Sequence, residues 1–333
     1  MPYRILALET SCDETAAAVV EDGRRILSSA VFSQIDVHAL YGGVVPEIAS
    51  RAHVEACDRM IDQALKEASL TISQIDALAV TCGPGLVGAL LIGVNCMKGL
   101  SFATGKPLIP VNHIEGHVSA NFLTHPQLAP PFVCLVVSGG HSHLVIVKDY
   151  GSYTLLGQTV DDAAGEAFDK AARVLGLPYP GGPHLSELAE GGDPAYLRLP
   201  RPQAGGKYDF SFSGLKTAFI NAVHTMEQKG QPLPKKDLAA SYQQAIVDCL
   251  CDKAMLAVRD SGLTTLCLAG GVSANRKLRE QMTALSLAQG VTLCMPALEL
   301  CTDNAAMIGS AAYYRREQVA ALDLNASPNL RLT

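Results

Sequence analysis

The sequence predicts an α/β protein built from two similar lobes. Its 333 residues exceed the size at which one hydrophobic core stops growing, and 48% hydrophobic against 17% charged residues suits a compact chain. A unit of strand, polar turn and strand occurs twice, about 130 residues apart, as in an internal duplication. Apolar runs that end in glycine and open helical patterns add strand–helix units.

The two strand–turn–strand units carry different turns. The first pairs residues 5–8 with 16–20 around a turn rich in hydroxyls and carboxylates at 9–15, and the second pairs 132–137 with 144–147. The second turn reads Ser138-Gly139-Gly140-His141-Ser142-His143. Its glycines let backbone N–H groups approach an anion such as phosphate. Glycine is also common in ordinary hairpin turns, so both interpretations stay open.

Between these units the chain alternates helices and strands. Residues 53–68 have helical periodicity, 75–80 resemble a buried strand, and the glycine-rich stretch 81–88 opens an apolar helix to about Phe102. That stretch matches neither G-x-G-x-x-G nor a P-loop, which favours a tight turn packing helix on sheet. A short strand at 108–111 follows, and the prolines in 124–131 predict a crossover between lobes.

The predicted domain boundary lies at this crossover. We expect one lobe over residues 1–128 and the other over 129–304, with a C-terminal helix over about 305–333 packing back on the first lobe.

Two histidines four residues apart open the helix predicted after residue 111. His113 and His117 share one helical face, so both imidazoles could bind one ion. Glu115 points away from them, unlike the Glu of an H-E-x-x-H protease helix, and Gly116 weakens the helix prediction. The alternative is a pair of histidines hydrogen-bonded inside a packed helix.

The second half begins with an acidic helix start at 161–170, where Asp162 and Asp169 share a face and carboxylates usually serve as caps. The glycines and prolines of 178–184 predict a loop of fixed shape. Basic residues alternate with aromatic ones over 198–216, which suits either RNA contact or a solvated surface loop.

A helix over 237–260 and a strand over 265–269 lead to the junction 270–276, where Asn275 could hydrogen-bond a ligand. Thr302 or Asp303 could be the N-cap of the final alanine-rich helix. Alternatively, Asp303 supplies the carboxylate that His113 and His117 need for a metal site.

Composition excludes several other classes. The ten cysteines include no C-x-x-C pair, which favours buried, reduced thiols in a cytosolic protein over a zinc ribbon or a disulfide framework. No signal peptide is visible, and the apolar stretch 86–94 is too short to span a bilayer. A net charge of −6 argues weakly against broad nucleic-acid binding.

Seven segments of the sequence, taken in order along the chain, resemble the TsaD/Gcp family, the tRNA threonylcarbamoyladenosine synthases. The resemblance covers roughly residues 3–315, and the tail 322–333 resembles the family least. The segments are 9–15, 113–117, 137–141, 161–170, 211–216, 270–276 and 301–304.

The resemblance implies an actin/Hsp70/sugar-kinase-like (ASKHA) fold, with mixed sheets flanked by helices and a ligand in the cleft between two lobes. It also implies transfer of a threonylcarbamoyl group from its adenylate to N6 of adenosine 37 in tRNAs that read ANN codons. Expected ligands are tRNA and either threonylcarbamoyl-AMP or ATP, ADP or AMP. Expected partners are a TsaB-like paralogue and a TsaE-like P-loop ATPase, in the cytoplasm and without a membrane.

By the same resemblance, His113, His117 and Asp303 hold one divalent metal ion, Fe²⁺ or alternatively Zn²⁺. The expected adenylate-binding residues are Val136, Val137, Ser138, Gly139, Gly140, Asp169, Gly182 and Asn275. Ser186 stands where the family usually has an acidic or polar partner.

The catalytic base is expected in the first turn. Asp13 or Glu14 would take the proton from the attacking amine, although both residues could instead cap the turn. Two rival functions are an ATP-driven switch of the same fold and a metallopeptidase. The histidine pair opposes the first, because such switches hold Mg²⁺ through oxygen atoms, and the direction of Glu115 opposes the second.

Overall fold

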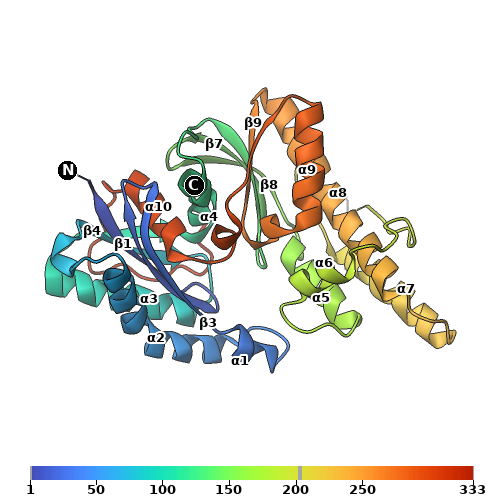
Figure 1. Ribbon diagram of the computed structural model, residues 1–333, viewed down its shortest axis with the longest axis horizontal. Coiled ribbons are helices and arrows are strands. Elements are labelled where there is room, and N and C mark those ends of the chain that lie inside the picture. The colour runs from blue at the N-terminus through green and yellow to red at the C-terminus, as the bar shows by residue number, and fades with distance from the viewer. Residues whose placement is uncertain (1, 202–204, 333) are drawn as a thin grey trace. The chain divides into compact units, whose positions relative to one another are not determined.

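The computed structural model describes residues 2–201 and 205–332. Contacts within the chain define two compact units: unit 1 comprises residues 1–130, 149–153 and 296–333, and unit 2 comprises residues 131–148 and 154–295. Each unit contains one five-stranded mixed sheet flanked by helices (Figure 1).

The sheet of unit 1 is built on a hairpin. Strands β1 and β2 pair antiparallel, β3 extends the hairpin, and β4 and β5 add parallel strands on the other side of β1. The order is β3 (Arg25–Ser33), β2 (Glu14–Glu21), β1 (Arg4–Glu9), β4 (Ala77–Gly83) and β5 (Leu108–Asn112).

Alternation along β1 explains why both faces of this sheet are covered. Ile5 and Ala7 belong to a buried cluster with α10, whereas Leu6 and Leu8 belong to another with α2 and α3. Figure 1 shows α10 on one side of the sheet and α2 and α3 on the other. The helices are α1 (Ile35–Ala39), α2 (Pro46–Glu67), α3 (Val87–Thr104), α4 (His113–Thr124) and α10 (Ala305–Tyr314), with 3₁₀ turns η1 (Ile72–Gln74) and η3 (Leu298–Leu300).

Unit 2 repeats this topology. Its β6 pairs antiparallel with β7 and parallel with β9, just as β1 pairs with β2 and β4. The order is β10 (Thr292–Cys294), β9 (Thr265–Ala269), β6 (Phe132–Val137), β7 (Ser142–Asp149) and β8 (Ser152–Gln158). The prediction of duplicated hairpins in an α/β chain is therefore confirmed.

One continuous core holds the helices of unit 2 on its sheet. Tyr242, in the N-terminal third of the long helix α8, is fully buried and donates its hydroxyl to Ala167 O. The helices are α5 (Ala164–Val174), α6 (Gly181–Leu188), α7 (Ser213–Gln228), α8 (Lys235–Ser261) and α9 (Arg276–Ala288), with the 3₁₀ turn η2 (Gly271–Ala274).

Three elements differ from the sequence prediction. Helix α6 begins at Gly181 inside the segment predicted to be a loop, because Pro180 precedes the first turn and leaves it free to form. The C-terminal helix ends at Tyr314 instead of running to 333. Residues 296–304, predicted within the second lobe, belong to unit 1.

The C-terminal tail instead crosses the end of the unit 1 sheet. Ser327 N donates to Cys82 O at 2.7 Å, and Asn112 donates its side-chain amide to Arg331 O at 3.1 Å. Contacts of this kind join the tail backbone to a carbonyl of β4 and a side chain of β5, so they leave no periodic pattern in the tail.

Helix α3 is longer than the apolar stretch recognised in the sequence. Over Val87–Thr104 it is long and apolar enough to cross a membrane, by length and composition alone. One such helix is weak evidence, because the core helix of a soluble protein passes the same test. Here Leu90, Val94 and Met97 are buried in unit 1.

Candidate metal centre and nucleotide-binding residues

Helix α4 begins at His113, directly after strand β5. The side chain of Asn112 accepts hydrogen bonds from Ile114 N at 2.9 Å and Glu115 N at 3.4 Å, which caps the helix. His113 and His117 are therefore one helical turn apart on a buried helix, as predicted.

The glycine between the histidines serves helix packing. A Cβ atom on Gly116 would lie 2.6 Å from Ile308 Cδ1 of α10, so a larger residue would require the Ile308 side chain to shift. The cost of glycine to helix formation is offset by tertiary contact, which the sequence prediction did not include.

A third ligand comes from the segment before α10. Asp303 Oδ1 lies 3.3 Å from His117 Nε2 and 3.5 Å from His113 Nε2, and one ligand atom from each residue lies within 4.8 Å of the others. The two imidazole rings are 4.6 Å apart between centroids, at 76°. All three residues belong to unit 1.

These separations suit a shared ion. Metal–ligand bonds of about 2.1 Å place two ligands of one tetrahedral ion about 3.4 Å apart. His117 supports the same conclusion, since it is fully buried and neither ring nitrogen makes a hydrogen bond within the described residues. A buried imidazole without hydrogen bonds is costly, and a bound cation would compensate it. Two histidines and a carboxylate are compatible with either iron or zinc.

The predicted N-cap of α10 was wrong. Asn304, rather than Thr302 or Asp303, accepts the capping hydrogen bond from Met307 N at 2.9 Å. Asp303 is thereby released from capping and faces the histidines.

A buried carboxylate orients His113, which the sequence analysis missed. Glu9 is fully buried at the end of β1, and its Oε2 lies 3.2 Å from His113 Nδ1. The same oxygen accepts the Thr81 hydroxyl at 2.6 Å, and Ser11 Oγ also lies 3.1 Å from His113 Nδ1. Anchoring Nδ1 in this way directs Nε2 towards Asp303 and the ion site. In the sequence, the only sign of this role is that a glutamate opens the predicted polar turn at 9–15.

The charges at this site favour a cation. Burial alone would lower the pKa of His113, but the charges of Asp303 and Glu9 outweigh burial and raise that pKa to about 9. Burial is the main reason that the pKa of His117 is lowered. Within the metal group, His113 therefore carries a proton at neutral pH that an incoming ion must displace.

Glu115 has a separate structural role. Its Oε1 accepts from Arg315 Nε at 2.6 Å and from the Tyr153 hydroxyl at 3.1 Å. It is therefore held away from the metal ligands, as its position in the helix predicted, and no base of the H-E-x-x-H type is present among the described residues of α4.

The two candidate bases lie near the metal group. Asp13 is buried in the turn after β1, and Glu14 opens β2, where its Oε1 accepts from Ser33 Oγ at 3.3 Å. Burial, followed by the charges of Asp303 and Asp13, raises the pKa of Glu14 to about 10. Glu14 is thus protonated at neutral pH and cannot accept a proton in that state.

In unit 2, the glycine turn lies against a helix start. Gly165 N donates to Ser138 O at 3.2 Å and Glu166 N to Gly139 O at 3.1 Å, so the first turn of α5 is joined to the hairpin. Ser138 N donates to His141 O at 2.8 Å and is not available to a ligand. The N–H groups of Gly139 and Gly140 have no acceptor within residues 2–201 and 205–332.

The remaining candidate residues of unit 2 are linked through α6. Asp169 Oδ1 accepts from Gly182 N at 3.0 Å, and Ser186, one turn later, lies 3.4 Å from Asn275 Nδ2. Val136 and Val137 are fully buried in β6, so they can support the turn but not present side chains.

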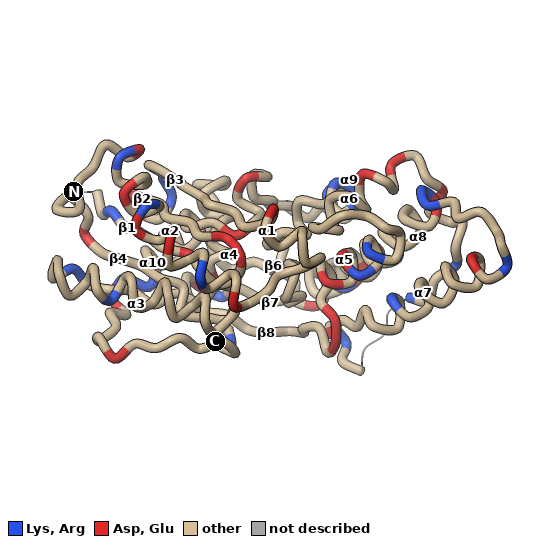
Figure 2. The backbone as a smooth tube through the Cα atoms, turned by 90° about the horizontal axis from the view of Figure 1, so that it is seen from below, with Lys and Arg blue, Asp and Glu red and all other residues tan. Residues whose placement is uncertain are grey.

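The basic segment 198–216 presents few groups that could contact RNA. Phe210 and Phe212 are fully buried in the core of unit 2, so their rings are unavailable for stacking on bases. Lys207 is ion-paired with Asp260 and Lys216 with Asp162. Figure 2 shows basic and acidic positions close together around α5. Residues 202–204 of this predicted segment lie outside the described residues.

Solved structures establish the class of fold. The chain aligns with HypF from T. kodakarensis at TM-score 0.64 and 13% identity, over 97% of this chain and 50% of that one. It also aligns with component A of (R)-2-hydroxyglutaryl-CoA dehydratase from Acidaminococcus fermentans at TM-score 0.56 and 14% identity, over 95% and 99%. Together with the duplicated sheets, these likenesses make it an ASKHA-type α/β protein.

Sequence comparison then identifies the family. The TsaD model, described as tRNA N6-adenosine threonylcarbamoyltransferase, matches residues 25–310. Proteins of that name from Clostridium botulinum (strain Kyoto / Type A2) and Clostridium perfringens (strain SM101 / Type A) are each 52% identical over 98% of this chain, covering 97% and 98% of their own lengths. The chain belongs to the TsaD family of transferases.

Proposed function

We propose that this chain transfers a threonylcarbamoyl group from threonylcarbamoyl-adenylate to N6 of adenosine 37 in tRNAs that read ANN codons, releasing AMP. The observation that carries the proposal is the convergence of His113, His117 and Asp303 in a member of this transferase family. Glu9 orients His113, one of the three candidate ligands. Candidate ligands that are held in place by a further residue support a metal site better than a chance cluster of surface side chains would.

The reaction requires no nucleophile from the protein. The adenylate is a mixed anhydride, so N6 of the adenosine attacks the carbamoyl carbon, a C–N bond forms and the C–O bond to phosphate breaks. One proton leaves the attacking nitrogen and AMP leaves with the electron pair of the broken bond. The protein must orient the two reactants, accommodate the phosphate charge and exclude water.

In this proposal, unit 2 binds the adenylate. The N–H groups of Gly139 and Gly140 donate to phosphate oxygens, while Val136, Val137 and Ser138 hold the turn in place. Asp169, Gly182 and Asn275 hold the nucleoside portion, and the hydrogen bond between Asp169 and Gly182 keeps the first of these residues in position.

Asp13 is the preferred proton acceptor. Glu14, the other candidate, is protonated at neutral pH because burial and neighbouring carboxylates raise its pKa to about 10. Asp13 lies in the same buried turn, and the role of base is assigned to its carboxylate.

The metal site is proposed to hold one divalent ion, Fe²⁺ or alternatively Zn²⁺, on His113, His117 and Asp303. Such an ion supplies Lewis acidity towards oxygens that gain negative charge. The chain itself contributes the fixed orientation of His113, set by Glu9 and Ser11.

The proposed setting is the cytoplasm, with tRNA as acceptor, and with a TsaB-like paralogue and a TsaE-like P-loop ATPase as partners. The net charge of −6 supports a need for such helpers, because an acidic chain holds RNA poorly by itself.

The test is His117→Ala in the complete system of chain, partners, tRNA and threonylcarbamoyl-adenylate. We expect loss of bound metal and a fall in transfer of about 100-fold or more, since a three-ligand site loses one of its ligands. His224→Ala, at an exposed histidine of α7, is the matched control and should retain both. A folded His117→Ala protein with unchanged metal content and transfer would refute the proposed role of the metal.

A further inference from the structure

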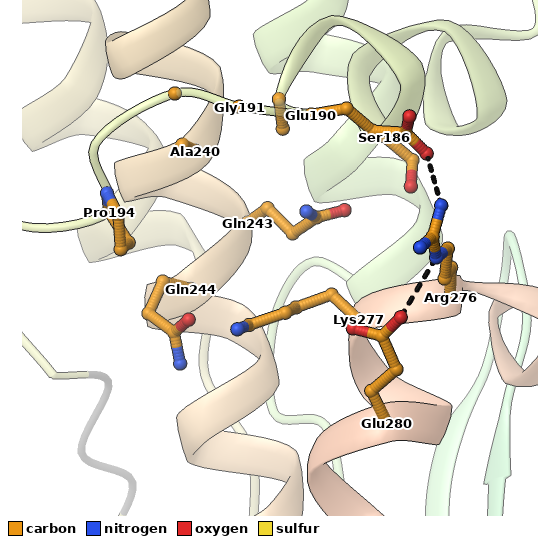
Figure 3. Close-up of a pocket in the computed structure, with 12 residues that line it drawn as sticks. Ser186, Glu190, Gly191, Pro194, Ala240, Gln243, Gln244, Arg276, Lys277 and Glu280 are labelled. Carbon is orange, nitrogen blue, oxygen red and sulfur yellow. Dashed lines mark hydrogen bonds and ion pairs between the residues drawn. The ribbon is translucent and has the colours of Figure 1, made fainter.

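A pocket of about 360 Å³ lies in unit 2 among α6, α8 and α9, beside Asn275 (Figure 3). Its wall includes Ser186, Gln243, Gln244, Arg276 and Lys277. Gln243 points into the pocket from α8 (Figure 3), yet it is only 7% exposed. A buried amide at the wall of a pocket requires defined hydrogen bonds, so its partners are informative.

The amide of Asn275 has one possible orientation. Its Oδ1 accepts from Leu278 N at 3.0 Å and caps α9, so the other end of the amide must be the donor Nδ2. Nδ2 carries two protons, and it lies 2.8 Å from Gln243 Oε1 and 3.4 Å from Ser186 Oγ.

Gln243 therefore provides the acceptor that holds Asn275. The hydrogen bond to Gln243 is short, whereas the contact with Ser186 is long and can yield to a ligand. With one Nδ2 proton held by Gln243, the second is directed towards Ser186, a residue of the pocket wall. Neither the family resemblance nor the residues assigned above includes Gln243.

We propose that Gln243 is a positioning residue of the nucleotide site, which acts by fixing the side-chain amide of Asn275. This inference rests on the proposed role of Asn275 in binding the adenylate. Gln243 sets how strongly the nucleoside portion is bound, and it takes no part in bond making or breaking.

The neighbouring Gln244 is a matched contrast. It is the same residue type, comes next in α8 and lines the same pocket. Its Nε2, however, donates to Asp248 Oδ1 at 2.6 Å and to Gln281 Oε1 at 2.8 Å, so its hydrogen bonds lead away from Asn275. A change at Gln244 disturbs the pocket wall without releasing Asn275.

The test measures AMP affinity of the full chain by calorimetry, and transfer kinetics in the complete system. Gln243→Leu removes the acceptor and should raise the Kd for AMP and the KM for the adenylate about three- to tenfold, the value of one hydrogen bond, with kcat little changed. Gln243→Glu keeps an acceptor oxygen and should stay within about twofold of the wild type. Gln281→Leu, at the partner of Gln244 in α9 and outside the pocket wall, should do the same.

A double-mutant cycle separates positioning from general damage. Asn275→Asp retains the capping oxygen but loses the Nδ2 donor, so Gln243→Leu should cause no further loss in that background. The melting temperature of each variant reports on folding independently of AMP binding.

Several outcomes would overturn the inference. These are unchanged AMP binding in Gln243→Leu, equal loss in Gln243→Glu or Gln281→Leu, and additive losses in the double variant. Failure of the wild-type chain to bind AMP, or unchanged binding in Asn275→Asp, would also overturn it. In each case transfer by the wild-type complex would still support the proposed function, whereas absence of that transfer would count against the function itself.

Discussion

The two sheets of this protein have the same topology, but the turns of their hairpins carry residues of different chemistry. In both, an antiparallel hairpin is extended by two parallel strands, through β4 and β5 in unit 1 and through β9 and β10 in unit 2. The turn of the first hairpin is acidic and buried, whereas the turn of the second consists of serine and exposed glycines.

Each turn is suited to a ligand of opposite charge. Glu9 and Ser11 hold His113 in unit 1, and Asp13 adds a further carboxylate, so this end of the sheet suits a cation. The N–H groups of Gly139 and Gly140, which have no acceptor in the described part of the chain, suit an anion in unit 2. A duplicated scaffold thus fixes where a site lies, while a few turn residues decide which ligand it accepts.

The largest expected effect concerns pH and the cation site. The metal-free protein holds a proton on His113, whose pKa is raised to about 9 by Asp303 and Glu9 against the effect of burial. Metal binding must release that proton, so affinity should rise about tenfold per pH unit from 6.5 to 8.5. Calorimetry in buffers of different ionisation enthalpy counts the proton, and a pH-independent affinity would contradict this account.

Glu9→Gln tests whether the acidic turn supports the ligands. Loss of the charge that anchors His113 Nδ1 should weaken metal binding about 10- to 100-fold, measured by competition with a chelator. Glu21→Gln is the control, because Glu21 lies in the same hairpin but pairs with Arg4 and Arg25. Equal metal affinity in the two variants would remove Glu9 from the site.

Gly85→Ala tests steric support of the same turn. A Cβ atom there would lie 2.5 Å from Ser11 O, a backbone atom that cannot swing aside. We expect a loss of about 1–3 kcal/mol in the free energy of unfolding, measured in urea. Gly99→Ala in α3, where nothing lies within 4 Å of the added atom, should cause no loss. Equal stability of the two variants would show that the turn adapts.

Gly140→Pro tests the glycine turn of unit 2, and its expected effect is the smallest. Proline removes the N–H proposed to donate to phosphate, which should raise the KM for the adenylate about three- to tenfold. Gly140→Ala keeps that N–H and has open space for its Cβ, so it should behave like the wild type in steady-state kinetics. A Pro variant with unchanged KM would exclude this N–H from phosphate binding.

The prediction from sequence succeeded where local pattern carries the information. Both hairpins follow from short apolar runs on either side of a polar turn, and the shared face of His113 and His117 follows from helical geometry. It failed where a local pattern competes with contacts across the fold. Gly181 and Gly182 begin α6 rather than extend a loop, and Asn304 rather than Asp303 caps α10.

The sequence by itself determined the class of fold, the duplication, the shared helical face of the two histidines and, through ordered motifs, the family, whose resemblance also predicted Asp303 as their partner. Tertiary structure decided which distant groups meet: Asp303 at the histidines, Glu9 behind His113, and Gln243 on Asn275. The physical reason is that periodicity encodes which face of an element is buried. Contacts between residues that are tens to hundreds of positions apart depend instead on how buried faces pack, and no spacing in the chain records them.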